Sequence, residues 1–239
     1  MAASNRSQRG PARPATKSWR PAAEQLEARA MLAVTVGLRP ASDSGVKGDL
    51  MTNVVKPVIV GSATPKAVVS ILVDNTPIGT VKAGGTGAWT FAKLPKLADG
   101  THVVAAVTAD GTATANVKID TQKPTATISY DNTQLDRVTV TLSKPVTGLT
   151  ASAFRLSGRP VGLPAFANVA LTDARLKPYI GASGVTLTPS QNGTTYTVSC
   201  PDLALYSGSY TLTLAKNPKI VDAAGNTLSQ SASTSGTIA

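Results

Sequence analysis

Short apolar or alternating runs, separated by turn signals, fill the chain from Asp43 onward and constrain its fold more than any other feature. In the first half these runs are VVKPVIVG, AVVSILVD, IGTVKA, AWTFAKL, HVVAAVTA and ATANVKID. Between them stand DNTP, GGTG and two copies of ADG, whose residue types favour tight turns. About six or seven strands at this spacing predict an antiparallel β-sandwich. Because Pro57 has no N–H for a sheet, the first strand is expected at an edge or with a bulge.

The pattern continues to about Ile238 in the runs PTATISY, RVTVTLSKPV, GVTLTPS, TTYTVSC and GSYTLTLA. A chain of 239 residues is long enough for two domains of about 100 to 120 residues, each with its own core. Aromatic residues make up only 4%, so β-branched residues are expected to fill thin cores. We therefore predict an all-β fold with two tandem β-sandwich domains, residues 41–120 and 121–239. They are joined by the linker IDTQKP, in which Pro124 restricts the backbone.

The first 40 residues differ from the rest and are predicted to form a disordered basic leader. Residues 1–23 are rich in Arg, Pro, Ala and Ser and show no apolar period. From Ala30 to Leu38 only Thr35 is polar, and several arginines precede this block. A basic region before a short apolar run is the outline of an export signal, and the run is too short to span a membrane. Against that outline, Glu24 and Glu27 lie close to the run, and no small-x-small cleavage site follows it before Asp43.

The stretch EQLEARAML resembles the LEPR-XLL motif found near the N-terminus of large exported planctomycete proteins. The matching residues are Leu26, Glu27, Arg29 and Leu32, whereas Ala28 and Met31 depart from the motif. The resemblance implies export and a short helix in the leader. The alternative is a disordered basic leader with a chance helical turn, because so short a segment does not fold alone.

Residues 43–120 resemble the bacterial Ig-like repeats of surface adhesins. The resemblance is carried by DSGVKGDLMTN, GSATPKAVVSILVDNTPIGTVKA, GAWTF and LADGTHVVAAV. The following residues, to about Ile238, resemble another bacterial Ig-like class through SKPVTGLT, the strand TTYTVS and the turn DAAGN. These resemblances imply Ig-like sandwiches outside the cell or at its surface. Trp89 is expected to fill the first core, since it is the largest side chain available there.

Calcium is the candidate chemistry, because oxygen-bearing residues gather near the predicted domain ends. They are Asp43, Asp49, Asn53, Asp120, Asp222 and Asn226. Calcium takes about six to eight oxygen ligands, and the adhesin resemblance implies junction aspartates in that role. Ser42 departs from this pattern, where a second aspartate is often found. Tight turns need the same residue types, so both interpretations stay open, and no catalytic, cofactor-binding or metal-binding residue is assigned.

Charge and motifs exclude several other functions. The net charge is +10, but half of the surplus lies in residues 1–40, and the remaining basic residues lack interleaved aromatics. We therefore predict no nucleic-acid partner; binding through the leader is an alternative that salt would abolish. One cysteine and one histidine exclude the familiar zinc sites. Cys200 is expected in the core and His102 at a strand edge. No GxSxG and no phosphate loop occur, so no enzyme is predicted.

The sequence thus predicts a secreted or cell-surface structural or adhesion module whose partner is an extracellular polymer or protein. The alternative is a carbohydrate-binding or accessory module. It would use residues 157–184, which are expected to form an insertion or long crossover between strands and carry Phe166 and Tyr179.

Overall fold

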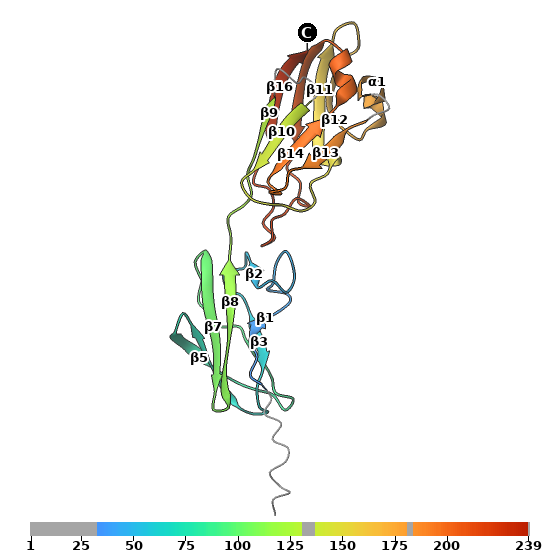
Figure 1. Cartoon of the computed structure of the whole chain (residues 1–239). Helices are drawn as coiled ribbons and strands as arrows, with labels where there is room; N and C mark the ends of the chain where they lie inside the picture. Colours follow the sequence, from blue (N-terminus) through green and yellow to red (C-terminus); the bar gives the residue numbers. More distant parts are fainter. Residues whose placement is uncertain (1–32, 131–136, 181–183, 239) are drawn as a thin grey trace, which may run out of the picture. The chain divides into compact units, whose positions relative to one another are not determined.

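The computed structural model describes residues 33–130, 137–180 and 184–238, and in these the fold is all-β, as predicted (Figure 1). The LEPR-XLL-like stretch and the expected leader helix lie outside the described residues. Four sheets and a few short helical turns make up the fold. One hydrophobic core draws on residues from Leu38 to Ile119 and another on residues from Ala126 to Ile238. The described residues fall in one compact unit, and a boundary between residues 120 and 121 stays a proposal.

Two sheets enclose the first core. The smaller one has the order β1-β3-β6 and consists of β1 (Gly37–Leu38), β3 (Ile59–Ser62) and β6 (Ala88–Phe91). The larger has the order β2-β8-β7-β4-β5 and consists of β2 (Met51–Thr52), β4 (Val68–Val73), β5 (Thr76–Lys82), β7 (Gly100–Thr108) and β8 (Gly111–Ile119). All pairings are antiparallel except that of β2 with β8, which is parallel.

Alternation along the strands builds this first core. In β4, Val69, Ile71 and Val73 are buried while the residues between them are more exposed, as expected for a strand with one face inward. Trp89 is only 4% exposed, which confirms its predicted packing role. Its ring lies over Gly61, where an added Cβ would come within 2.4 Å of the ring. Glycine at this position therefore makes room for the indole.

The first strand corrects two of the predictions. Residues up to 40 were expected to be disordered, but Gly37 and Leu38 pair with Val60 and Ile59. The reason is a period of two: Val34, Val36 and Leu38 face the core and alternate with more polar or small residues. Part of the apolar block that resembles an export signal is therefore a core strand. Pro57 was expected to place its strand at a sheet edge or in a bulge, but β3 begins only at Ile59. Because Pro57 lies outside the strand, β3 can occupy the central position between β1 and β6.

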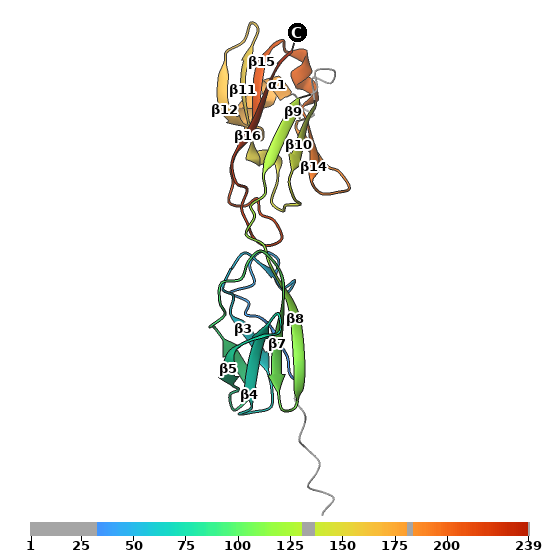
Figure 2. The same cartoon turned by 90° about the vertical axis from the view of Figure 1, so that its left-hand side faces the viewer.

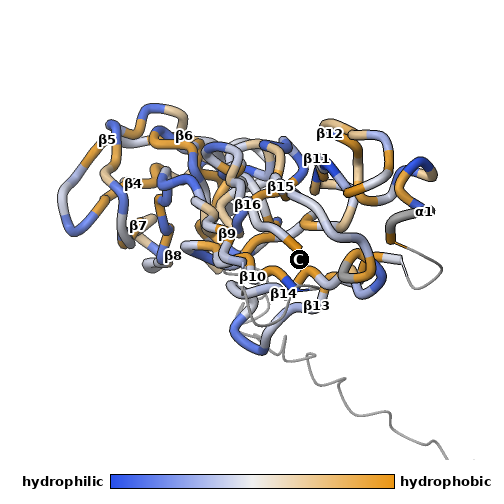
Figure 3. The backbone as a smooth tube through the Cα atoms, turned by 90° about the horizontal axis from the view of Figure 1, so that it is seen from above, coloured by the Kyte–Doolittle hydropathy of each residue, from blue (hydrophilic) through white to orange (hydrophobic). Residues whose placement is uncertain are grey.

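Two four-stranded sheets enclose the second core (Figure 2). One has the order β13-β14-β10-β9, with β9 (Ala126–Tyr130), β10 (Arg137–Leu142), β13 (Thr186–Pro189) and β14 (Thr195–Ser199). The other has the order β12-β11-β15-β16, with β11 (Phe154–Pro160), β12 (Phe166–Ala170), β15 (Gly208–Leu214) and β16 (Ala232–Ile238). The helical segments are η2 (Ala151–Ala153), η3 (Ala174–Leu176), α1 (Lys177–Ile180) and η4 (Pro201–Leu205). Figure 3 shows hydrophobic (orange) and hydrophilic (blue) stretches alternating along the chain, and Phe154 and Leu214 are fully buried in the second core.

Residues 157–184 do not form the long loop or crossover expected from the sequence. Their described part completes β11 and forms the edge strand β12 and the segments η3 and α1. Leu171, Leu176 and Ile180 are buried in the second core. The prolines of this region suggested a loop, but Pro160 is the last residue of β11, where the strand ends in any case.

Candidate functional site: the Lys144 cluster

Five residues from three segments meet where the linker reaches the second sandwich, and we call them the Lys144 cluster. They are Asp120, Gln122, Lys144, Asp222 and Asn226. Asp120 directly follows β8 and Lys144 follows β10. The two other polar residues belong to the DAAGN turn after β15. Bridges from Val221 to Thr147 and Thr227 hold this turn beside the segment that carries Lys144.

The ammonium of Lys144 is surrounded by oxygens. Its Nζ donates to Oδ1 and Oδ2 of Asp120 at 2.9 and 2.8 Å, and to the backbone oxygen of Gln122 at 2.6 Å. It also donates to Oδ2 of Asp222 at 3.2 Å. The Lys144 side chain is 24% exposed, and that of Asp222 only 4%. Burial alone would lower the pKa of Lys144, but its hydrogen bonds to Asp120 and Asp222 outweigh burial and raise that pKa above the ordinary 10.5.

Asn226 completes the cluster by satisfying the buried carboxylate. Its backbone N–H donates to Oδ1 of Asp222 at 2.8 Å, and its Nδ2 donates to Oδ1 and Oδ2 at 3.3 and 3.1 Å. The same Nδ2 donates to the backbone oxygen of Asp120 at 2.8 Å. A buried carboxylate is tolerated only when it is paired and hydrogen-bonded, and Asp222 receives both a cation and amide donors. Each charged group of the cluster therefore has a partner, although one ammonium faces two carboxylates and the formal net charge is −1.

The structure gathers only three of the six residues predicted as possible calcium ligands, namely Asp120, Asp222 and Asn226. The other three make contacts near their own positions. Asp43 is buried and its Oδ2 accepts from Gly48 N at 2.6 Å. Asp49 caps its own turn by accepting from Met51 N at 2.9 Å, and Asn53 N donates to Ser44 Oγ at 2.8 Å. Among the described residues no group of three or more His, Cys, Asp or Glu side chains could hold a metal.

Sequence reasoning missed Lys144 and Gln122. Lys144 stands in the run RVTVTLSKPV, where it reads as an ordinary turn lysine, and Gln122 contributes a backbone oxygen that any residue could supply. The first loop also reaches the DAAGN turn, because Ser44 Oγ donates to Ala224 O at 2.6 Å and Val46 N to Ala223 O at 3.1 Å. These contacts join residues about 180 positions apart in the chain, so no local sequence motif predicts them.

His102 lies on β7, as the sequence suggested, and forms a small clamp. Its Nδ1 is 2.7 Å from Oδ2 of Asp74 and its Nε2 is 3.0 Å from Ala98 O. The hydrogen bond with Asp74 raises the pKa of His102 above 6.5, although burial opposes the shift. Hydrogen bonds from His102 and Val103 lower the pKa of Asp74. The clamp holds the turn after β4 against β7, which is a structural rather than a catalytic use of histidine.

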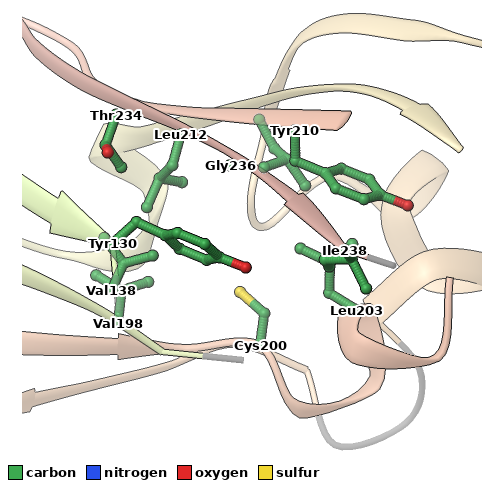
Figure 4. A pocket seen from close by; sticks show the side chains of 11 residues that line it. Tyr130, Val138, Val198, Cys200, Leu203, Tyr210, Leu212, Thr234, Gly236 and Ile238 are labelled. Atoms are coloured by element: carbon green, nitrogen blue, oxygen red, sulfur yellow. The ribbon is translucent and has the colours of Figure 1, made fainter. Parts of the chain in front are cut away.

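Cys200 lies in the second core, as expected, and is 6% exposed. It lines a small apolar cavity between the two sheets, into which Tyr130 and Tyr210 also project (Figure 4). The cavity volume is about 40 Å³, which is room for a few water molecules at most. Burial raises the pKa of the Tyr130 phenol. A space of this size does not suit an organic ligand, so the cavity is a packing feature.

Phe166, one of the two aromatic residues proposed for carbohydrate contact, packs against the second core. It is half-buried on β12, and its ring centroid lies 6.5 Å from that of Tyr210. Both rings lie over Gly158, where a Cβ would come within 2.6 Å of Phe166. The side chain of Tyr179 lies outside what the structure describes. Phe166 therefore packs partly against Tyr210, and both residues also line a hollow of about 600 Å³.

Comparison with known proteins gives one family match. Residues 30–121 match the family described as bacterial Ig-like domain, so the first sandwich is similar to such domains. No curated protein matches the chain. None of the described helices is long and apolar enough to cross a membrane.

Several solved structures are similar at low identity. The chain is 13% identical to the BSP domain of a biofilm associated protein, with a TM-score of 0.25, covering 79% of this chain and 28% of that one. It is 11% identical to domains A168–A170 of titin, with a TM-score of 0.25, covering 86% and 63%. It is 9% identical to domains 5–6 of the S-layer protein SbsC, with a TM-score of 0.23, covering 87% and 96%. The chain thus spans less than two thirds of the first two structures.

Proposed function

We propose that this chain is a non-enzymatic structural or adhesion module that works outside the cell or at its surface. The observation that carries the proposal is the match of residues 30–121 to bacterial Ig-like domains, which a second β-sandwich follows. The Lys144 cluster supports it as well, because Asp222 and Asn226 in it are buried. Asp222 accepts hydrogen bonds from Asn226 and forms an ion pair with Lys144. These interactions are suited to stabilising a fold rather than to acid–base chemistry.

The proposed mechanism is passive. Antiparallel sandwiches with well-filled cores resist deformation, and hydrogen bonds fix the linker between the two cores on both sides. Asp99 accepts from Thr121 N at 3.1 Å and from Gln122 Nε2 at 3.0 Å, while Lys144 binds Asp120. A partner would be an extracellular polymer or protein. Binding of a carbohydrate through residues 157–184 is the alternative, in which Phe166, half-buried beside Tyr210, would supply a contact from the hollow that it lines.

Protease treatment of intact cells of the native organism tests the location. An antibody against residues 41–239 should lose its signal when intact cells are treated, whereas a cytoplasmic marker protein should survive until lysis. A signal that persists until the cells are broken would contradict a surface or extracellular role. Co-sedimentation of the purified chain with isolated cell envelopes then distinguishes an adhesive role from a purely structural one. If the chain binds to the envelopes and added soluble envelope polymer releases it, the result supports adhesion.

A further inference from the structure

The oxygens around Lys144 form a coordination shell for a cation. Four oxygens lie 2.6 to 3.2 Å from Nζ and come from Asp120, Gln122 and Asp222. These lengths suit charge-assisted hydrogen bonds, which are about 2.7 to 2.9 Å at best. Metal–oxygen bonds to calcium would be shorter, at about 2.3 to 2.6 Å. The Lys144 ammonium thus donates to three residues on two segments, the linker and the DAAGN turn.

Lys144 joins these two segments to the start of the second sandwich. Asp120 and Gln122 belong to the linker itself, and Asp222 belongs to the DAAGN turn of the second sandwich. Asn226 adds a neutral bond between the same turn and the linker, through its Nδ2 and Asp120 O. A single side chain from the start of the second sandwich thus ties the linker to a turn that lies 78 residues further along the chain.

An ion pair in full contact with water would contribute little to such a joint, because water screens the attraction between its charges. The Lys144 cluster differs because one of its carboxylates is almost fully buried. Asp222 is 4% exposed, so removing its cation leaves a charge that water reaches poorly. The neighbouring linker residue Lys123 is exposed and serves as a comparison.

We propose that Lys144 is a built-in cation that fastens the linker to the second sandwich, so that the joint needs no bound metal ion. The inference goes beyond the proposed function and does not depend on it, because it concerns which group closes the joint. It assigns Lys144 a positioning role: the lysine acts through Asp120 and Asp222 and orders the backbone from residue 120 to 124.

Hydrogen–deuterium exchange on the full chain tests this role, with Lys144→Ala compared with Lys123→Ala. Peptides covering residues 120–125 and 222–226 should exchange on the order of tenfold faster in Lys144→Ala, while peptides from β7 and β8 should not change. Lys123→Ala also removes one positive charge, from the linker itself, and should leave both regions at the wild-type rate. Equal rates in wild type and Lys144→Ala would overturn the proposal, as would equal acceleration in the two variants.

A calcium arm separates the lysine from a metal. In wild type, exchange in these two regions should be the same with millimolar calcium and with a chelator. If calcium slows it in wild type, and Asp222→Asn removes that effect, a metal ion rather than Lys144 closes the joint and the proposal fails. Should Lys144→Ala not fold, amine acylation of the wild-type chain replaces it. Lys144 should then label at least about tenfold more slowly than Lys123, and equal labelling would overturn the proposal.

Discussion

Replacing Leu38 by alanine measures how much the first strand contributes to the fold. Leu38 is 8% exposed and packs in the first core, on a strand that pairs with β3. The substitution removes three carbons, which at about 0.8 kcal/mol for each buried CH₂ gives roughly 2.4 kcal/mol. A cavity term adds to this in rigid cores, where such substitutions cost about 2 to 5 kcal/mol. Because β1 is an edge strand and can relax, we expect about 2 to 3 kcal/mol.

Urea unfolding of the full chain is the assay, followed by tryptophan fluorescence. The chain has two tryptophans, Trp19 and Trp89. A Trp19→Phe background leaves Trp89, in the first core, as the single reporter. Leu205→Ala is the matched control, since Leu205 is 77% exposed and lies in the second sandwich. This control should change the free energy of unfolding by no more than about 0.5 kcal/mol.

The refuting result is a Leu38→Ala variant that unfolds at the same urea concentration as Leu205→Ala. Such a result would mean that residues up to 40 contribute nothing to the first core, as the sequence alone predicts for a disordered leader. A loss of about 2 kcal/mol or more would place the start of the folded chain before Leu38. If the first sandwich unfolds on its own, each kcal/mol should lower its melting temperature by about 4 to 8 °C.

Two further perturbations test the first sandwich. His102→Gln should remove a pH dependence of stability: with its raised folded-state pKa, protonated His102 stabilises the fold fully below its ordinary pKa of 6.5, and this is lost as pH rises through the raised value. Melting curves should therefore show wild type losing stability relative to the variant above about pH 6.5, and parallel profiles would contradict the clamp with Asp74. Trp89→Ala should cost about 3 to 5 kcal/mol. Trp89→Phe should cost clearly less, because among the described residues no partner accepts its buried Nε1–H, and equal losses in urea would argue against that difference.

The strand pattern of the chain was predictable, because alternation is a local property that a sheet preserves. Val69, Ile71 and Val73 could be assigned inward from spacing alone, and Trp89 from its size. The first strand was missed for a physical reason. Val34, Val36 and Leu38 follow a basic segment, and an apolar run after arginines fits an export signal as well as it fits a strand. Only the pairing of Gly37 with Val60 distinguishes the two.

Residues 157–184 show the opposite error. Prolines are strong turn signals, and Pro160, Pro164 and Pro178 favoured a loop. The segment folds onto the second core because Leu171 and Leu176 are buried there, against residues that are distant in the sequence. Local signals mark where a strand can end, but they do not show whether the next segment returns to the core.

The Lys144 cluster lay beyond sequence reasoning because its chemistry depends on convergence. Asp120 and Asp222 were among six possible calcium ligands, with tight turns as the open alternative, and the structure brings both to Lys144. The nature of the cation could not be inferred, since a turn lysine 24 residues after Asp120 gives no sign of reaching back to it. Aspartates at a joint indicate only that positive charge is needed there. Calcium and an ammonium both supply positive charge. Binding of calcium depends on its concentration, whereas a lysine is part of the chain and is present at any calcium concentration. If Lys144 closes the joint, the linker should keep its conformation in surroundings poor in calcium, where a joint that depends on the metal would loosen.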